Sequence, residues 1–142
     1  MITERLLGLD IGDARIGVAV SDELGMIASP VATVNARGDL AGEMQKLVQK
    51  YGVTRIVVGL PIGMSGREGQ QASDVRKVAD YLAKKLEIDI VYSDERLSSA
   101  MANQALISQG TRREKRKQHV DAMAAAVILQ GYLDNERWKL GK

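Results

Sequence analysis

The chain has 142 residues, of which 45% are hydrophobic and 27% charged, and it contains no cysteine. This length suits one domain, and we expect it to span residues 1–138, followed by a frayed tail at residues 139–142. The composition excludes a disulfide scaffold, a thiolate zinc site and a membrane-spanning run. The first residues lack the basic and apolar regions of a secretory signal, so we expect a cytoplasmic protein without a membrane partner. The net charge of +2 says little about polyanion binding.

The first 34 residues predict three strands joined by tight turns. Stretches typical of strands cover residues 6–10, 14–22 and 26–34, and Gly12 and Gly25 lie in the turns between them. Strands joined by such short turns pair antiparallel, so we expect a meander.

The rest of the chain alternates between helices and strands. A helix is predicted from Asp39 to a terminating Gly52. Residues 55–61 (RIVVGLP) form a run that is apolar after its first residue, as in a parallel strand buried on both faces. A glycine-rich loop (62–69) precedes an amphipathic helix with apolar residues from Ala72 to Leu86, and a fifth strand follows at residues 88–96. We expect a helix over 98–108, a polar connection over 109–118, a last helix over 118–133 and a frayed chain after residue 134. The sum is an α/β fold, a five-stranded mixed sheet flanked by helices.

Two acids lie where the predicted strands end. Asp10 ends the first strand, just before Gly12. Ligands of α/β folds bind beyond the carboxyl ends of strands, although Asp and Gly are also common in plain turns. Glu95 follows the fifth strand, and it is either functional or a solvated acid paired with Arg96. Only one of Asp94 and Glu95 can share a face with Asp10, because strand side chains alternate.

Asp121 is the acid that the sequence singles out most clearly. Its neighbours at helical spacing, Ala124, Ala125 and Ile128, are apolar. Its carboxylate therefore lies beside the face of the last helix that packs on the sheet. Burying an unpaired carboxylate is costly, and a cation or a metal compensates for it. The alternative is an acid in the first helical turn, favoured by the helix dipole.

The three acids together predict a divalent-metal site. Asp10, Glu95 and Asp121 come from distant segments, and their oxygens suit Mg²⁺ or Mn²⁺. Two such ions about 4 Å apart can activate a water and stabilise the leaving oxygen in phosphodiester cleavage. We therefore predict that these residues are metal ligands and catalytic residues. His119, the single histidine, points about 200° away from Asp121 on a helix. It is either an exposed helix-start residue or a helper in substrate contact or proton transfer.

A run of basic residues directly precedes the last helix. Such a run is often only a solvated connection, but beside a metal cluster a basic loop would attract a phosphate backbone without reading bases. The predicted nucleic-acid-binding residues are Arg15, Arg67, Arg96, Arg112, Arg113, Lys115, Arg116 and Lys117. With one Trp, four Tyr and no Phe, stacking on single-stranded bases is not favoured, so structured or duplex nucleic acid fits better.

Four ordered motifs across nearly the whole chain resemble the YqgF/RuvX family, described as Holliday junction resolvases and as nucleases of pre-ribosomal RNA, within the ribonuclease H-like superfamily. They are LGLDIGDARIGVAVSD (7–22), IVVGLPIGMSG (56–66), SDERLSS (93–99) and QHVDAMAAAVILQGYL (118–133). The resemblance implies a sheet of order 3-2-1-4-5 with strand 2 antiparallel, and a metal site at Asp10, Glu95 and Asp121. Since strands 1 and 5 are then about 10 Å apart, a glutamate suits the reach across that gap.

The resemblance also leaves several functions open. We expect a divalent-metal-dependent endonuclease that processes the 5′ end of precursor 16S rRNA, a preference that comes from the family's description. Resolution of four-way DNA junctions is the alternative, and it calls for a symmetric dimer rather than a monomer. Further alternatives are a non-catalytic nucleic-acid-binding protein, a partner of ribosome-assembly or transcription proteins, and an ATP-binding relative of sugar kinases and actin. That last class needs two such domains.

Overall fold

The structure is a computed structural model, and it describes residues 5–61, 69–94 and 113–140, apart from the side chains of residues 94, 113–119 and 137–140. The described elements are β1 (Arg5–Ile11), β2 (Arg15–Ser21), β3 (Ala28–Asn35), α1 (Leu40–Tyr51), β4 (Val53–Leu60), α2 (Gln70–Leu86), β5 (Asp89–Asp94) and α4 (Arg113–Leu140). The described strands and the first two helices match the predicted ones closely. Over these ranges no helix is long and apolar enough to cross a membrane.

The five strands form one mixed sheet in the order β3-β2-β1-β4-β5. β2 pairs antiparallel with both β1 and β3, whereas β4 pairs parallel with β1 and β5. Both the order and the antiparallel β2 confirm the prediction. The carboxyl ends of β1, β4 and β5 therefore meet at one edge of the sheet, which also holds the start of β2.

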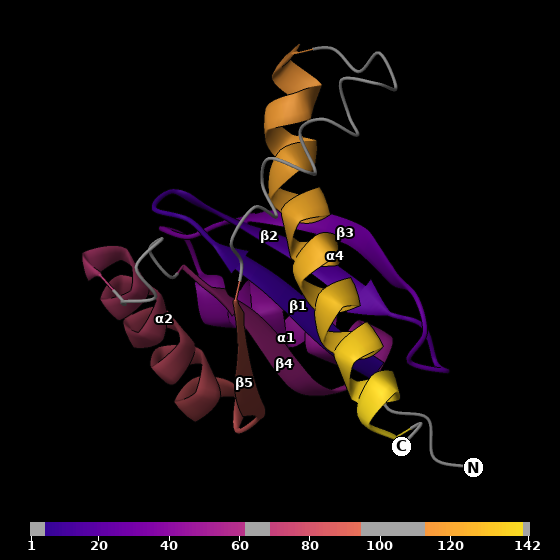
Figure 1. Ribbon diagram of the computed structural model, residues 1–142. Coiled ribbons are helices and arrows are strands. Elements are labelled where there is room, and N and C mark those ends of the chain that lie inside the picture. The colour runs from indigo at the N-terminus through magenta and orange to yellow at the C-terminus, as the bar shows by residue number, and fades with distance from the viewer. Residues whose placement is uncertain (1–4, 62–68, 95–112, 141–142) are drawn as a thin grey trace.

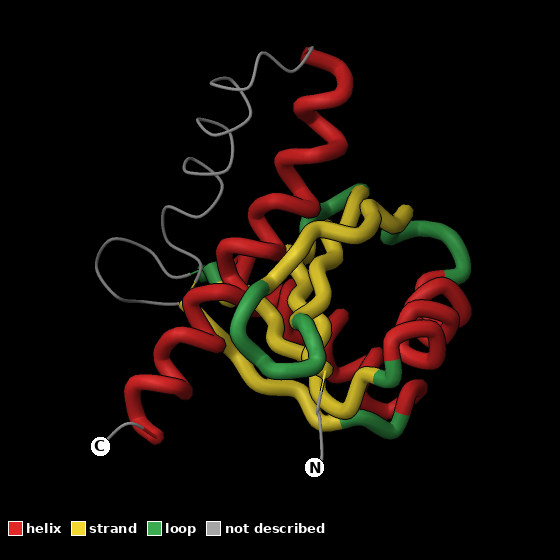
Figure 2. Tube along the Cα trace, turned by 90° about the vertical axis from the view of Figure 1, so that its right-hand side faces the viewer, coloured by secondary structure: helices red, strands yellow, loops and turns green. Residues whose placement is uncertain are grey.

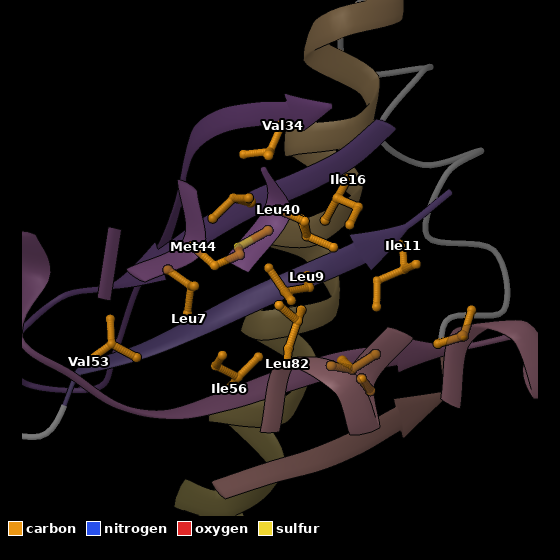
Figure 3. Packing of buried hydrophobic residues seen from close by; sticks show 14 of the residues in the cluster. Leu7, Leu9, Ile11, Ile16, Val34, Leu40, Met44, Val53, Ile56 and Leu82 are labelled. Atoms are coloured by element: carbon orange, nitrogen blue, oxygen red, sulfur yellow. The ribbon is translucent and has the colours of Figure 1, made fainter. Parts of the chain in front are cut away.

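Helices cover the two faces of this sheet unequally, as Figures 1 and 2 show: α1 and α2 lie on one face, and α4 crosses the other. The face under α1 and α2 is the larger apolar layer. There Leu7, Leu9 and Ile11 of β1 pack with Met44 of α1 and Leu82 of α2 (Figure 3). Strand side chains alternate, so the intervening residues of β1 point toward α4.

Two glycines on the face toward α4, Gly8 of β1 and Gly17 of β2, bring this helix close to the sheet. A Cβ atom on Gly8 would lie 2.7 Å from Cβ of Leu129 and 3.0 Å from the carbonyl oxygen of Ala125. A Cβ on Gly17 would overlap the backbone carbonyl of Asp121. Glycine at these two positions is thus what allows the backbone of α4 to touch β1 and β2.

The last helix is longer than predicted at both ends. The interpretation of residues 109–118 as a polar connection is wrong for residues 113–118, and that of a frayed chain after residue 134 is wrong as far as Leu140. Arg, Lys, Glu and Gln dominate the first segment, and these residues have high helix propensity even where they carry no apolar stripe. After residue 133, an i,i+4 bond from Gln130 Nε2 to Asp134 Oδ1 (3.0 Å) continues the helical pattern. The predicted helix at 98–108 lies outside the described residues, and the domain limits stay a prediction.

Candidate active site

The β1–β2 hairpin places Asp10 and Arg15 at the same edge of the sheet. Asp10 is the last residue but one of β1, and it pairs with Gly17 of β2. The turn between the strands is tight, because the Gly12 N–H donates to the Arg15 carbonyl at 2.9 Å. The backbone of Arg15 is thereby fixed, while its side chain is half exposed.

Asp121 reaches this edge from α4, the helix that packs on one face of the sheet. Its backbone lies against Gly17, the residue paired with Asp10, so the missing side chain of Gly17 is what brings Asp121 beside β1 and β2. The Asp121 side chain is only 22% exposed. The structure therefore brings together two of the three predicted acids, Asp10 and Asp121, and their charges interact.

Arg15 forms an ion pair with Asp121. Arg15 Nε lies 2.9 Å from Asp121 Oδ2. That oxygen is fully buried, and no described donor, Arg15 included, is aligned to make a hydrogen bond to it. The contact is therefore mainly electrostatic and leaves a buried carboxylate oxygen that can accept more.

The pKa of Asp121 is raised above the ordinary value of 3.8. Burial is the largest cause because it penalises the charged carboxylate. The guanidinium of Arg15 opposes it by favouring the charged form, whereas the like charge of Asp10 adds to it. Because the pKa is raised overall, the surroundings of Asp121 stabilise its negative charge less well than water does.

We expect Asp121→Asn to raise the thermal midpoint of the metal-free protein at neutral pH. A carboxyl whose pKa is raised on folding stabilises the fold below 3.8, and this contribution is lost as the pH rises through the folded-state pKa. At pH 7 the ionised group is then a net cost, which the neutral amide removes. The measurement is thermal unfolding in EDTA between pH 7 and pH 4. The difference in thermal midpoint between Asp121→Asn and wild type should shrink toward pH 4. Asp13→Asn, at an exposed residue of the neighbouring turn, is the control. A lower midpoint for Asp121→Asn than for wild type at pH 7 would contradict this account.

Several other predicted site residues lie outside the described part of the chain. These are Arg67, Glu95, Arg96 and Arg112. The described residues alone contain no group of three metal-binding side chains, so the predicted three-acid cluster remains a prediction.

The basic run is helical from Arg113 onward, which corrects the expectation of a basic loop. The residues concerned are Arg113, Lys115, Arg116 and Lys117, and His119 follows them in the same helix. Figures 1 and 2 show that the first turns of α4 project beyond the sheet. The backbone of the basic run thus extends outward from the edge that holds Asp10 and Asp121.

Sequence reasoning missed two features of this edge. It predicted that Arg15 binds phosphate and did not predict its ion pair with Asp121. The predicted hairpin between the first two strands already placed Arg15 at the same edge of the sheet as Asp10. It also gave Gly17 no role. A glycine inside a strand pattern is a recognisable sign of close backbone approach.

The sheet order and the helix packing define the ribonuclease H-like fold. Two solved structures show this fold at low sequence identity. T. thermophilus RuvC in complex with a Holliday junction substrate has a TM-score of 0.60 and 13% identity, covering 95% of this chain and 96% of that one. The Fowlpox virus resolvase in complex with Holliday junction DNA has a TM-score of 0.55 and 9% identity, covering 93% and 98%.

Within this class, the model of the RuvX family, described as Holliday junction resolvase, matches residues 4–135. The chain therefore belongs to the RuvX family, a family of nucleases. Relatives named "Putative pre-16S rRNA nuclease" support this membership. The one from Heliobacterium modesticaldum is 47% identical over 133 residues, covering 92% of this chain and 89% of the relative. The one from Lactococcus lactis subsp. cremoris is 43% identical over 141 residues, covering 96% and 98%.

Proposed function

We propose that this protein is a divalent-metal-dependent endonuclease that acts on structured nucleic acid. The observation that carries the proposal is the buried Asp121 carboxylate, held beside Asp10 at the sheet edge where ligands of α/β folds bind. A buried carboxylate close enough to a second acid for their charges to interact is typical of a site completed by a cation.

The described residues fit a hard divalent ion. Asp10 and Asp121 offer carboxylate oxygens, which Mg²⁺ and Mn²⁺ prefer. Oδ2 of Asp121 is buried and already contacts a cation, the Arg15 guanidinium at 2.9 Å, so this edge is suited to holding positive charge. When bound, two such ions supply an activated water and charge stabilisation at the leaving oxygen.

Glu95, rather than Asp94, is the third acid of the proposed site. Val91 packs with Val57 in the apolar cluster under α4, on the face to which the side chain of Asp10 also belongs, whereas Tyr92 packs in the cluster under α1 and α2. Asp94 lies two residues after Tyr92 and pairs with Leu60. Its position in the strand register therefore belongs to the face under α1 and α2. The alternation of strand side chains therefore favours Glu95 as the partner of Asp10.

We further propose that the substrate is precursor 16S rRNA, cut at its 5′ end during ribosome biogenesis. The names of the relatives support this substrate. Basic residues at the start of α4, with Arg67, Arg96 and Arg112, would hold the phosphate backbone without reading bases. The description of the RuvX family supports a second candidate, resolution of four-way DNA junctions. This second function would require a dimer with two-fold symmetry, since two strands are cut.

A cleavage assay with purified protein separates these possibilities. Precursor 16S rRNA and a four-way DNA junction would each be incubated with wild type in Mg²⁺, in Mn²⁺ and in EDTA. We expect metal-dependent cleavage of the RNA, and a loss of about 100-fold or more for Glu95→Gln, because even residues behind metal ligands cost 10–100-fold. Asp94→Asn, which neutralises the acid directly before Glu95, is the matched control and should retain most activity.

The outcomes of this assay are distinct. Cleavage of the junction alone, by a dimer in sedimentation analysis, would select the resolvase function. Cleavage in EDTA would contradict the metal-dependent mechanism. Binding of either nucleic acid without cleavage would favour a non-catalytic binding protein or a partner of ribosome-assembly or transcription proteins.

A further inference from the structure

Arg15 occupies the position in which a cation is most needed at the proposed site. Its Nε is 2.9 Å from the buried Oδ2 of Asp121, the oxygen that no described donor reaches with hydrogen-bonding geometry. The two charges come from separate elements, the first residue of β2 and the buried side of α4. They meet only because Gly17 lets these elements touch.

The ion pair has unequal partners. The side chain of Asp121 is 22% exposed, whereas that of Arg15 is 47% exposed. Asp121 is held in place by the helix backbone packed on Gly17, while the guanidinium reaches it through a long, flexible side chain. Arg15 can therefore leave the pair toward solvent at little cost in hydration, but Asp121 cannot.

The charge balance also favours exchange. Two charges act on Asp121 in opposite directions: the guanidinium of Arg15 favours its ionised form, and the like charge of Asp10 disfavours it. An ion with two positive charges compensates both carboxylates better than one guanidinium does. A divalent ion held by Asp121 would need the carboxylate that Arg15 contacts, so the two cations would compete for it.

We propose that Arg15 is an exchangeable counter-cation of the site, which pairs with Asp121 before a divalent ion binds and gives up that carboxylate when the ion loads. The proposal rests on the metal site of the proposed function. It assigns Arg15 a role in setting how tightly the site takes up its ion. It also makes the half-exposed guanidinium available, after loading, for the phosphate contact that its position at the edge suggests.

Calorimetric titration of Mn²⁺ into the intact protein tests this role without relying on activity. We expect Arg15→Gln to bind Mn²⁺ about 3–10-fold more tightly than wild type, because the competing charge is gone. Arg37→Gln is the matched control. It removes one exposed positive charge from the turn after β3, two residues beyond Asn35, which pairs with Arg15. This control should change the affinity by less than about 2-fold, since screening weakens charges without direct contact.

A double-mutant cycle shows whether the gain acts through Asp121. In the Asp121→Asn background, Arg15→Gln should no longer tighten Mn²⁺ binding, because the neutral amide offers nothing to compete for. In EDTA, Arg15→Gln should also lower the thermal midpoint, and saturating Mn²⁺ should close that gap. Arg15→Lys keeps the charge without the planar guanidinium, so its Mn²⁺ affinity should lie between those of wild type and Arg15→Gln. This variant carries the test if Arg15→Gln folds poorly.

These titrations distinguish a failure of the Arg15 exchange from a failure of the metal site. If wild type binds Mn²⁺ and Arg15→Gln binds it equally or more weakly, the exchange is overturned while the metal site stands. The same holds if Arg15→Gln gains as much affinity in the Asp121→Asn background as in wild type. If wild type binds no Mn²⁺ at all, both the exchange and the proposed function fail.

Discussion

Asp10→Asn is expected to slow nucleic-acid cleavage by about 100-fold or more while leaving the fold intact. The amide keeps the size of the carboxylate but is a poor ligand for a hard divalent ion. Loss of residues that only support metal ligands costs 10–100-fold, so loss of a ligand itself belongs at or beyond the upper end of that range. The measurement is single-turnover cleavage of the substrate that wild type cuts, with circular dichroism to verify folding.

A second readout ties this effect to the pair of acids. Asp10 raises the pKa of Asp121 by like-charge repulsion, so Asp10→Asn should lower the pKa of Asp121 in the metal-free protein, which NMR titration can follow. Asp13→Asn is the matched control, because Asp13 is an exposed acid in the turn just after β1. Wild-type cleavage rates in Asp10→Asn would exclude Asp10 from the catalytic site.

Gly17→Ala is expected to destabilise the protein by about 1–3 kcal/mol, the usual cost of overpacking a tight contact. The new methyl group would overlap the backbone carbonyl of Asp121, and backbone cannot move aside as the end of a flexible side chain can. α4 would therefore shift away from β2 and carry the Asp121 carboxylate with it. Because a misplacement of about 1 Å can cost 100-fold in rate, cleavage should fall by more than the loss of folded protein explains.

Gly131→Ala provides the matched control within the same helix. A Cβ atom at Gly131 would meet nothing within 4 Å, so alanine should stabilise the helix by about 0.5–1 kcal/mol and leave cleavage unchanged. Urea unfolding of both variants gives the two free energies. Equal stability of Gly17→Ala and wild type would show that the close contact between α4 and β2 is not required.

The sequence by itself determined the strands, their antiparallel and parallel pairing, and the helices α1 and α2, because these depend on local patterns. The continuous apolar run of β4 predicted a strand buried on both faces, and the stripe from Leu40 to Tyr51 with Gly52 behind it predicted α1 and its end. Asp121 could be singled out because apolar neighbours at helical spacing place a carboxylate beside a packed face. The limits of α4 were misjudged, since a polar segment without an apolar stripe has no periodicity to distinguish helix from connection.

Only the tertiary structure decided which groups meet. That Arg15 pairs with Asp121, 106 residues later, depends on the depth to which α4 packs on the sheet, and the absent side chains of Gly8 and Gly17 set this depth. The burial that raises the pKa of Asp121 likewise arises only when helix and sheet come together. Local patterns encode the conformation of each segment, whereas contacts between distant segments depend on the shapes of both packed surfaces, which no single stretch of sequence contains.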